Sequence, residues 1–537
     1  MKCRSALWAS AALLFTLVQA SPWAPSANIH PASGNTGYRT HKSKFSNNQL
    51  RVKSWAKDET PLCPGAAAHH TGWADFGHRH IFFWYHEARY NPKDAPLLVW
   101  FQGGPGVSSL HGMLYENGPC LADDKNGTQS NQYSWTEYFN VVYLDNPVGV
   151  GFSYVDDLDD PESYPSTTVE SSCDVVTWLK LFYEVFPHLS TVDLHLSGES
   201  YAGRYVPVLA STIVEYNQFL LSSPLGTSKL GSEVIPLRSL MFGNPMIDPA
   251  VQFPASYDES CFEYRGRWPP RVDEKDCAAA LKHLDACEAA LRSCSQHSDQ
   301  PLICNAAREL CFEKFLDHLH HGNTSSYDRR RLNCEDMDGC FPDIHQPGDF
   351  LNTPEVIEGL IEAPQQTGSR RTRWSMGTDM IMKRFSESGD GMIPSTGNLA
   401  RVLQVGRRQA SASDHSSVRT IDVMVYVGTA DAACDPNSVY EALRGIQWEG
   451  RVPFRSVQWN PLPWSLPDGQ PSGRVKAVPN LWMVEIEEAG HMVPYDQPET
   501  SLRMVKLWLE HIEGTSSTLG GRRGSSEDGQ QRILTGW

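Results

Sequence analysis

Apolar residues gather in short runs along this chain, and several of the runs have the length of a buried strand. Two longer segments, 201–221 and 498–512, carry apolar side chains at helical spacing instead and predict helices. Because one strand leads directly into the helix at 201–221, the pattern favours an α/β fold with a mostly parallel sheet. The strands predicted in this way are residues 97–101, 192–196, 421–427 and 481–486.

The turn between the strand at 192–196 and the following helix carries a serine, Ser200, between Gly198 and Gly203. We interpret it as a nucleophile elbow of the G-x-S-x-G type, the strand-to-helix turn on which α/β-hydrolases present their nucleophile. So tight a turn leaves little room for side chains, which accounts for the glycines. An ordinary glycine-containing loop is the alternative, so the interpretation depends on finding partners for the serine.

A serine nucleophile needs a base and a carboxylate that orients the base. In an α/β-hydrolase these follow the nucleophile in the order acid, then histidine, and each comes after a strand. Asp431 follows the predicted strand at 421–427, and His491 follows the one at 481–486. We therefore predict a catalytic triad of Ser200, Asp431 and His491. Taken singly, Asp431 could be a turn residue and His491 a surface histidine, but their order and placement favour the triad.

The oxyanion that develops during acyl transfer needs two hydrogen-bond donors. The residue after the nucleophile, Tyr201, supplies one backbone N–H by its position. The strand at 97–101 runs into a glycine-rich turn, residues 102–106, and we assign the second donor to the N–H of Gly104. A plain turn without a catalytic role is the alternative here.

These motifs together resemble those of the serine carboxypeptidases, exopeptidases with an α/β-hydrolase core that are secreted or vacuolar. The resemblance extends from about residue 72 to about residue 512. It implies the α/β-hydrolase fold, peptide substrates with a free C-terminus, and no cofactor or metal. The blocks that carry it are 84–89 (WYHEAR), 103–106 (GGPG), 116–119 (ENGP), 145–154 (DNPVGVGFSY), 198–203 (GESYAG), 243–245 (GNP) and 490–494 (GHMVP).

The resemblance also implies a site for the C-terminal carboxylate of the substrate, formed by Gln102, Gly103, Glu116 and Glu199. A carboxylate cannot bind beside ionised glutamates, so at least one of the two acids must keep its proton. Burial and like charge would raise their pKa values, and we expect peptide hydrolysis to be fastest at acidic pH. Without the resemblance, Glu199 would be taken as an exposed turn residue and Glu116 as an acid on a helix surface.

Two positions depart from the family pattern. Gln102 stands where the family usually has Asn, so its amide lies one methylene further out, and Val107 stands where a disulfide-forming Cys is customary. Neither change touches the triad. They leave open an esterase or acyltransferase that uses the same triad. A non-catalytic binding protein on the same scaffold is a further alternative, which the intact triad disfavours.

Sequence signals indicate an exported protein. Residues 1–20 have the charged start, apolar stretch and small-residue end of a secretory signal peptide, and Asn126 and Asn323 lie in glycosylation sequons. We expect secretion, with a vacuole- or lysosome-like compartment as the alternative. The net charge of −17 argues against nucleic acid and anionic membrane surfaces as partners. No apolar stretch has the length that insertion into a membrane requires, and the oligomeric state is left undetermined.

Cysteines are concentrated in one segment that contains eight of them. In an exported protein such a cluster predicts disulfides, and a zinc site is the alternative. Cys434 lies close to Asp431 in the sequence, and the resemblance suggests that it is a free thiol near the active site. The basic runs 329–331 and 370–371 are interpreted as solvated loop charges or processing sites. The clustered cysteines are Cys261, Cys277, Cys287, Cys294, Cys304, Cys311, Cys334 and Cys340.

These features predict an order of regions along the chain. A polar N-terminal arm that could include a propeptide follows the signal peptide, and a disordered tail ends the chain. A Cys-rich insertion that caps the active site divides the hydrolase core into two parts. The predicted regions are the arm (21–70), the first part of the core (71–245), the cap insertion (246–380), the second part of the core (381–513) and the tail (514–537).

Overall fold

The computed structural model of the protein describes residues 37–57, 62–222, 234–320, 324–334, 337–361, 373–405 and 420–514. The predicted signal peptide, the tail from residue 515, the sequon at Asn323 and the basic pair 370–371 lie outside these ranges. Asn126 lies within them. It is exposed between two short antiparallel strands, β6 (Cys120–Ala122) and β7 (Thr128–Ser130).

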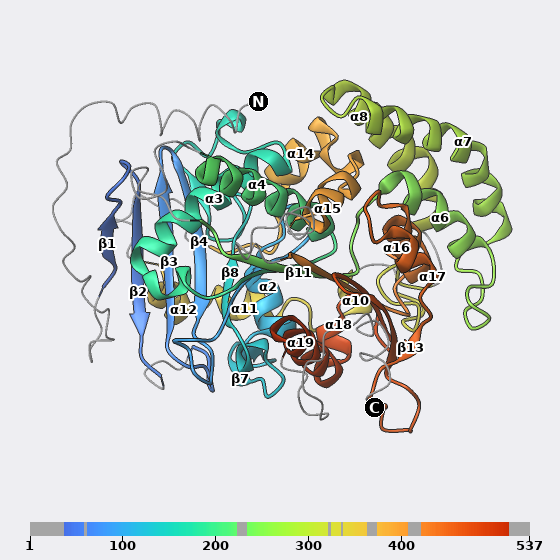
Figure 1. The fold of residues 1–537 in the computed structure, drawn as a ribbon. Helices are drawn as coiled ribbons and strands as arrows, with labels where there is room; N and C mark the ends of the chain where they lie inside the picture. The colour runs from blue at the N-terminus through green and yellow to red at the C-terminus, as the bar shows by residue number, and fades with distance from the viewer. Residues whose placement is uncertain are drawn as a thin grey trace.

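One large mixed sheet runs through the molecule (Figure 1). The strands at its centre are parallel and lie in the order β8, β5, β10, β11, β12, β15. Antiparallel strands extend the sheet on both sides, β1 to β4 beyond β8 and β14 and β13 beyond β15, and β9 pairs with β4. The strands are β1 (Arg39–Lys42), β2 (Gln49–Trp55), β3 (His69–Phe76), β4 (Arg79–His86), β5 (Leu97–Phe101), β8 (Asn140–Leu144), β9 (Tyr154–Val155), β10 (Leu194–Glu199), β11 (Leu237–Gly243), β12 (Asp422–Gly428), β13 (Asn460–Pro461), β14 (Gly473–Val478) and β15 (Leu481–Ile486).

The predicted strands are present with small shifts. Those at 97–101 and 481–486 have the same bounds in the structure as β5 and β15, and the one at 421–427 is β12, one residue later. The strand predicted at 192–196 begins two residues later and continues to Glu199 as β10. Within β5, Val99 packs into the core on one face of the sheet and Trp100 into the core on the other. Because both faces are covered, these strands appear in the sequence as continuous apolar runs.

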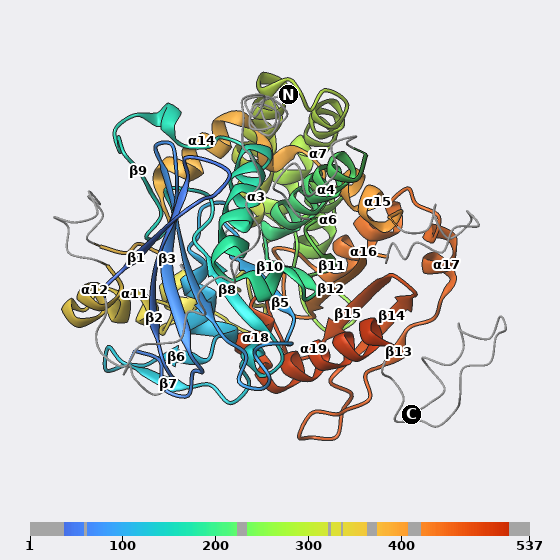
Figure 2. The ribbon, with the colours of Figure 1, turned by 60° about the vertical axis from the view of Figure 1, so that its left-hand side comes forward.

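Helices cover both faces of the sheet (Figure 2). Helices α3 and α4 pack on one face and α19 on the other, so the prediction of an α/β-hydrolase fold is confirmed. The predicted helices at 201–221 and 498–512 are α4 and α19. No described helix combines the length and the apolar character that crossing a membrane would require. The helices and turns around the sheet are α2 (Ser109–Gly112), η1 (Met113–Asn117), η2 (Trp135–Glu137), η3 (Pro161–Ser163), α3 (Thr168–Val185), η4 (Pro187–Ser190), α4 (Ala202–Ser222), α14 (Asp379–Ser388), η6 (Asp390–Met392), α15 (Thr396–Leu403), α16 (Pro436–Gly445), α17 (Arg451–Ser456), α18 (Val493–Asp496) and α19 (Pro498–Glu513).

A helical segment between β11 and β12 carries the clustered cysteines, and α6 to α8 project at one side of the molecule (Figure 1). All eight cysteines are paired, so the prediction of disulfides is confirmed and the zinc alternative is wrong. The pairs are Cys261–Cys277, Cys287–Cys311, Cys294–Cys304 and Cys334–Cys340. The helices of this segment are α6 (Pro249–Cys261), α7 (Glu274–Gln296), α8 (Pro301–Leu310), η5 (Cys311–Leu316), α9 (Asp317–His320), α10 (Met337–Cys340), α11 (Gln346–Leu351) and α12 (Pro354–Leu360).

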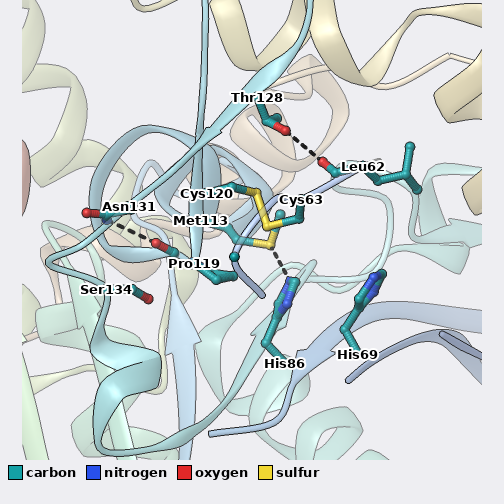
Figure 3. Close-up of a disulfide and its surroundings, with 12 residues drawn as sticks. Leu62, Cys63, His69, His86, Met113, Pro119, Cys120, Thr128, Asn131 and Ser134 are labelled. Carbon is teal, nitrogen blue, oxygen red and sulfur yellow. Dashed lines mark hydrogen bonds between the residues drawn. A yellow bond between two sulfur atoms is a disulfide. The ribbon is translucent and has the colours of Figure 1, made fainter. Parts of the chain in front are cut away.

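A fifth disulfide joins Cys63 to Cys120 and lies beside two stacked, buried histidines (Figure 3). One of them, His86, places Nε2 at 3.2 Å from the sulfur of Met113, the first residue of η1. Burial lowers the pKa of His86 well below its ordinary value, so the imidazole stays neutral. The disulfide fixes the chain at Cys120, just after η1, and His86 packs against Met113 at the start of η1. Both ends of η1 are therefore held in place.

The basic run 329–331 is only partly exposed, and its first two members are paired with acids, so their interpretation as solvated loop charges is wrong. Arg329 is buried and forms an ion pair with the buried Glu259. Arg330 forms ion pairs with Asp328 and Asp496. Both Glu259 and Asp496 lie far from the run in sequence, so inspection of the run alone could not find them.

Candidate active site

Ser200 lies in the turn between β10 and α4 and has a positive φ of 62°. Such a backbone is strained for a residue with a side chain and is typical of functional sites. Its N–H donates to the carbonyl of Gly243 at 3.0 Å, and its own carbonyl accepts from the N–H of Met246 at 3.0 Å. These bonds fasten the turn to the last residue of β11 and to the segment that follows it, so Ser200 is held at the carboxyl edge of the sheet.

Close backbone contacts require small residues around Ser200. A Cβ on Gly198 would lie 2.2 Å from the carbonyl oxygen of Phe101, and one on Gly203 would lie 2.6 Å from a backbone oxygen of the loop after β11. The residue two positions after the serine is Ala202, however, so the turn departs from the strict G-x-S-x-G pattern that we assigned to it. The methyl group of Ala202 lies against Gly198, where it fits because Gly198 has no side chain.

Asp431 and His491 follow β12 and β15 and meet in a buried hydrogen bond. His491 Nδ1 lies 2.8 Å from Asp431 Oδ2, and neither residue is more than 4% exposed. Asp431 also accepts from the side-chain amide of Asn244 at 2.7 Å and from the N–H of Ala433 at 2.9 Å. With Nδ1 donating to the carboxylate, Nε2 is the basic nitrogen of the imidazole. It has no hydrogen-bond partner among the described residues, so it is free to accept a proton.

The three predicted triad residues come after neighbouring parallel strands. The strands β10, β11, β12 and β15 lie in this order, and Ser200, Asp431 and His491 follow the first, third and fourth. Carboxyl ends of parallel strands share one edge of the sheet, where α/β proteins place their active sites. Asn244 follows β11 and contacts Asp431, a role that sequence analysis missed. The signal that could have found it is an Asn directly after a buried strand.

The glycine-rich turn after β5 lies against the candidate nucleophile. A Cβ on Gly103 would lie 2.6 Å from Ser200 Cβ and 2.9 Å from the nitrogen of Tyr201. Gly104 has a φ of 111°, which only glycine adopts readily. Among the described residues, no protein acceptor takes the N–H of Gly104 or of Tyr201. Two backbone donors are therefore available next to Ser200, as an oxyanion site requires.

Gln102, Glu116 and Glu199 form a buried cluster beside the same turn. The Gln102 amide donates to Glu116 Oε1 at 3.0 Å and to Glu199 Oε1 at 3.2 Å. Trp100 fixes the amide by donating from Nε1 to Gln102 Oε1 at 2.8 Å. Both glutamates are only 2% exposed, although Glu116 lies on η1 and Glu199 ends β10. The alternatives of a surface acid and an exposed turn residue are therefore wrong.

The two glutamates favour their protonated forms. Burial raises the pKa of Glu116 to about 7, although hydrogen bonds from Glu199 and Gln102 act in the opposite direction. Burial and the charge of the adjacent Glu116 raise the pKa of Glu199 well above its ordinary value. The pair therefore holds at least one proton at neutral pH, and a second as the pH falls below about 7.

The match to known proteins extends over most of the chain. A family model described as serine carboxypeptidase matches residues 62–511. This chain belongs to the serine carboxypeptidase family. It is therefore a serine-type carboxypeptidase by family, and peptides are the substrates that this family implies.

Other serine carboxypeptidases resemble it at moderate identity. Carboxypeptidase Y homolog A of Arthroderma otae is 30% identical over 477 residues, which cover 88% of this chain and 80% of the relative. The protein of the same name from Trichophyton tonsurans is 32% identical over 477 residues, which cover 87% and 78%. The structure of Kex1(delta)p, a prohormone-processing carboxypeptidase from Saccharomyces cerevisiae, has a TM-score of 0.65 at 22% identity and covers 86% of this chain and 91% of that one. At that identity it shows a shared fold.

In this serine carboxypeptidase, Cys434 is a buried free thiol beside the predicted triad residues Asp431 and His491. One ligand-type atom each of Cys434, Asp431 and His491 lie within 4.8 Å of one another. Burial and the nearby carboxylates raise the pKa of the thiol well above its ordinary value, which makes it a poor metal ligand. The other two groups already bind each other. The cluster therefore fits the hydrogen-bonded pair of Asp431 and His491 better than a metal site, and the absence of a metal stays a prediction.

Proposed function

We propose that the protein releases amino acids from the C-terminus of peptides at acidic pH, through an acyl-enzyme on Ser200. The observation that carries this proposal is the buried cluster of Gln102, Glu116 and Glu199, because Glu199 directly precedes the nucleophile. Among the described residues, neither glutamate forms an ion pair with a basic side chain. Two buried acids without a basic partner retain protons, and a protonated carboxyl group can donate a hydrogen bond to a carboxylate.

The catalytic step would use the residues at the carboxyl edge of the sheet. His491 Nε2 takes the proton of Ser200 Oγ as this oxygen attacks the last peptide carbonyl. Asp431 accepts from Nδ1 and stabilises the imidazolium. The N–H groups of Gly104 and Tyr201 hold the oxyanion of the tetrahedral intermediate. His491 then protonates the amine of the departing amino acid as the C–N bond breaks, and water hydrolyses the acyl-enzyme by the same route.

Restriction to the last residue would follow from where the free carboxylate binds. We assign it to the carboxyl groups of Glu116 and Glu199, with the Gln102 amide and the N–H of Gly103 as further donors. The backbone of Gly103 lies in contact with Ser200. This proximity supports a site for the carboxylate one residue away from the scissile bond. Acidic pH keeps Glu116 protonated, since its pKa is about 7.

An esterase or acyltransferase is the second candidate, and the environment of Gln102 favours it. In this structure the amide oxygen of Gln102 accepts from Trp100, and its NH₂ group donates to both glutamates. A substrate carboxylate must therefore displace existing hydrogen bonds before it can use this amide, which weakens the preference for a free C-terminus.

We propose that the protein is exported, to the outside of the cell or to a vacuole-like compartment. Five disulfides among the described residues and the exposed sequon at Asn126 support this. We also propose that residues 246–380 cap the site. Tyr327 of this segment packs its ring on His491, with 4.7 Å between the ring centroids, which supports a cap that shapes the substrate pockets.

The proposed function can be tested with a blocked dipeptide that carries a free C-terminus, compared with its C-terminal amide, between about pH 4 and about pH 8. Ser200→Ala removes the nucleophile, and Ser222→Ala, at the exposed end of α4, is the matched control. We expect fast cleavage of the free acid at low pH by the wild type and the control, and none by Ser200→Ala. Equal rates on acid and amide, or turnover of esters alone, would favour the second candidate.

A further inference from the structure

A short segment of the insertion, residues 325–331, connects the two loops that carry Asp431 and His491. The carbonyl of Ser326 accepts from the N–H groups of Ala432 and Ala433, at 2.9 and 2.8 Å. The N–H of Arg329 donates to the carbonyl of Ala430 at 2.9 Å. The loop of Asp431 is thus bound on both sides of the aspartate.

The same segment binds the loop of His491. The N–H of His491 donates to the carbonyl of Tyr327 at 2.7 Å, and the Tyr327 ring packs edge-on against the imidazole. A Cβ on Gly490 would lie 2.5 Å from the Tyr327 carbonyl oxygen and 2.9 Å from Asp328 Cβ. The two backbones are therefore packed so closely that any shift of the segment moves the histidine.

Arg330 joins this segment to the far end of the histidine loop. Its Nε and one Nη donate to the two oxygens of Asp328, both at 2.8 Å, and the same Nη lies 2.8 Å from Asp496 Oδ2. Asp496 Oδ2 in turn accepts from the N–H of Gly490 at 2.7 Å. The other Nη donates to the carbonyl of Glu488. One guanidinium therefore contacts the segment at Asp328 and the start of the histidine loop at Glu488. Through Asp496 it is also connected to Gly490, the residue before His491.

The charges make this arrangement dependent on the arginine. Asp328 is fully buried, and the side chain of Asp496 is 9% exposed. Burial raises the pKa of Asp496, the Arg330 guanidinium lowers it and the Asp328 carboxylate raises it, so the two acids repel each other without the cation between them. Arg331 also pairs with both acids, but at longer distances, 3.3 Å to Asp328 and 3.9 Å to Asp496. Without Arg330 the two buried carboxylates would share this one weaker partner, which is unfavourable. Loss of Arg330 would therefore release the loop of His491.

We propose that Arg330 is a positioning residue for the reaction: with Asp328 and Asp496 it holds the loop of His491 so that the imidazole meets both Ser200 and Asp431. The inference rests on the proposed role of His491 as the base. On this inference Arg330 is important to the chemical step, although the arginine itself contacts no reacting atom.

Arg330→Met and Arg330→Lys test this with the full-length enzyme, and Arg267→Met is the matched control. Arg267 also pairs with the histidine loop, through Glu487 and Glu488, but all three side chains are at least 35% exposed. Such exposed pairs contribute little. Each variant is assayed with the blocked dipeptide and with a blocked amino-acid ethyl ester, which has no free carboxylate and so reports on the triad alone.

We expect kcat of Arg330→Met to fall by about 10- to 100-fold on both substrates, as for a small displacement of a catalytic group, while KM changes by less than about threefold. Arg330→Lys should recover part of the loss, since its ammonium can bridge the two acids with fewer hydrogen bonds. Addition of guanidinium ion at millimolar concentration to Arg330→Ala should also restore activity, which a general loss of stability would not allow. The control should keep wild-type kcat.

An unchanged kcat in Arg330→Met, a change in KM alone, or an equal loss in Arg267→Met would overturn the inference. Where Arg330→Met does not fold, Asp496→Asn carries the same test, because it keeps the shape and an acceptor for Gly490 but removes the charge that Arg330 binds. Full activity of Ser200→Ala would instead overturn the proposed function, so the two failures are distinguishable.

Discussion

Glu116 and Glu199 are buried side by side and share one amide, whose Nε2 lies 3.0 Å from Glu116 Oε1 and 3.2 Å from Glu199 Oε1. Neither side chain has a basic partner among the described residues. A pair of this kind can accept an anion only while it holds its protons. The relationship therefore ties the binding of a free C-terminus to pH.

The first prediction concerns this pH dependence. Burial raises the pKa of Glu116 to about 7, so the group is protonated below that value and ionised above it. Burial and the adjacent Glu116 also raise the pKa of Glu199 well above its ordinary value. We expect KM for a free-acid dipeptide to rise above neutral pH by up to about tenfold per unit, because the ionised Glu116 repels the carboxylate. KM for the dipeptide amide should not follow this rise.

Glu116→Gln isolates the effect, since glutamine keeps the shape and cannot ionise. In this variant the KM of the acid substrate should be nearly flat from about pH 6 to about pH 8. Glu355→Gln, on the exposed face of α12, is the control. If the rise in KM survives in Glu116→Gln, another group controls the binding of the carboxylate.

The second prediction concerns the space that Gln102 occupies. A Cβ on Gly112 would lie 2.3 Å from Gln102 Oε1 and 2.6 Å from Trp100 Nε1, so Gly112→Ala must displace the amide. The displaced amide could then no longer donate to the substrate carboxylate, and a hydrogen bond to a charged group is worth about 1.5–3 kcal/mol. KM for the free-acid dipeptide should therefore rise about tenfold or more. Ethyl-ester hydrolysis should stay unchanged.

The double variant Gly112→Ala with Gln102→Asn provides the internal check, because the shorter side chain vacates the place of the new methyl group. It should regain part of the lost affinity. Gly397→Ala, with nothing near its added Cβ, is the matched control. A rise in KM for the ester, or a double variant worse than the sum of the single ones, would contradict this account.

Much of the scaffold could be predicted from the sequence because its signals are local. The strands β5 and β15 are continuous apolar runs covered on both faces, and their bounds follow from the runs themselves. The pairing of Asp431 with His491 could be expected since chain order and strand ends place both at one edge. The sequence pattern does not indicate which polar side chains become buried. Arg330 looked like a loop charge because its partner Asp496 lies far along the chain.

The third prediction concerns Asn244, whose amide donates to Asp431 Oδ2 at 2.7 Å. Asn244 has a φ of 44°, so Asn244→Gly removes the side chain without backbone strain, whereas Asn244→Ala adds strain. We expect kcat of Asn244→Gly to fall about tenfold or more, because a hydrogen bond to the charged carboxylate is worth about 1.5–3 kcal/mol. KM should change little.

The rate at which an organophosphorus reagent labels Ser200 reports on the same defect without a substrate, and it should fall in parallel with kcat. Asn244→Asp should be more impaired than Asn244→Gly, since it places a second carboxyl group against Asp431. Wild-type labelling and turnover in Asn244→Gly would show that the other donors suffice to hold Asp431.

The fourth prediction concerns stability at the pH where the enzyme is proposed to work. His195 lies in β10, is 1% exposed, and bonds Ser239 Oγ through Nδ1 at 2.7 Å. Burial, and to a smaller degree the charge of Arg238, lowers its pKa to about 3 in the folded protein. In the unfolded chain the pKa is about 6.5, so as the pH falls the unfolded state gains a proton that the folded state does not bind. This group therefore contributes stability above about pH 6.5 that is lost progressively as the pH falls toward about 3.

For His195 alone, the loss between pH 7 and pH 5 amounts to about 2 kcal/mol of unfolding free energy. His195→Asn can keep a hydrogen bond to Ser239 but cannot ionise, so its unfolding free energy in urea should fall by about 2 kcal/mol less over this range than that of the wild type. Acids with raised pKa values, such as Glu116, contribute with the opposite sign, but they do so equally in both proteins and cancel in the comparison. His345→Asn, at a histidine whose side chain is 59% exposed, should leave the pH dependence unchanged. Parallel curves for His195→Asn and the wild type would show that His195 binds its proton equally well in the folded and the unfolded chain.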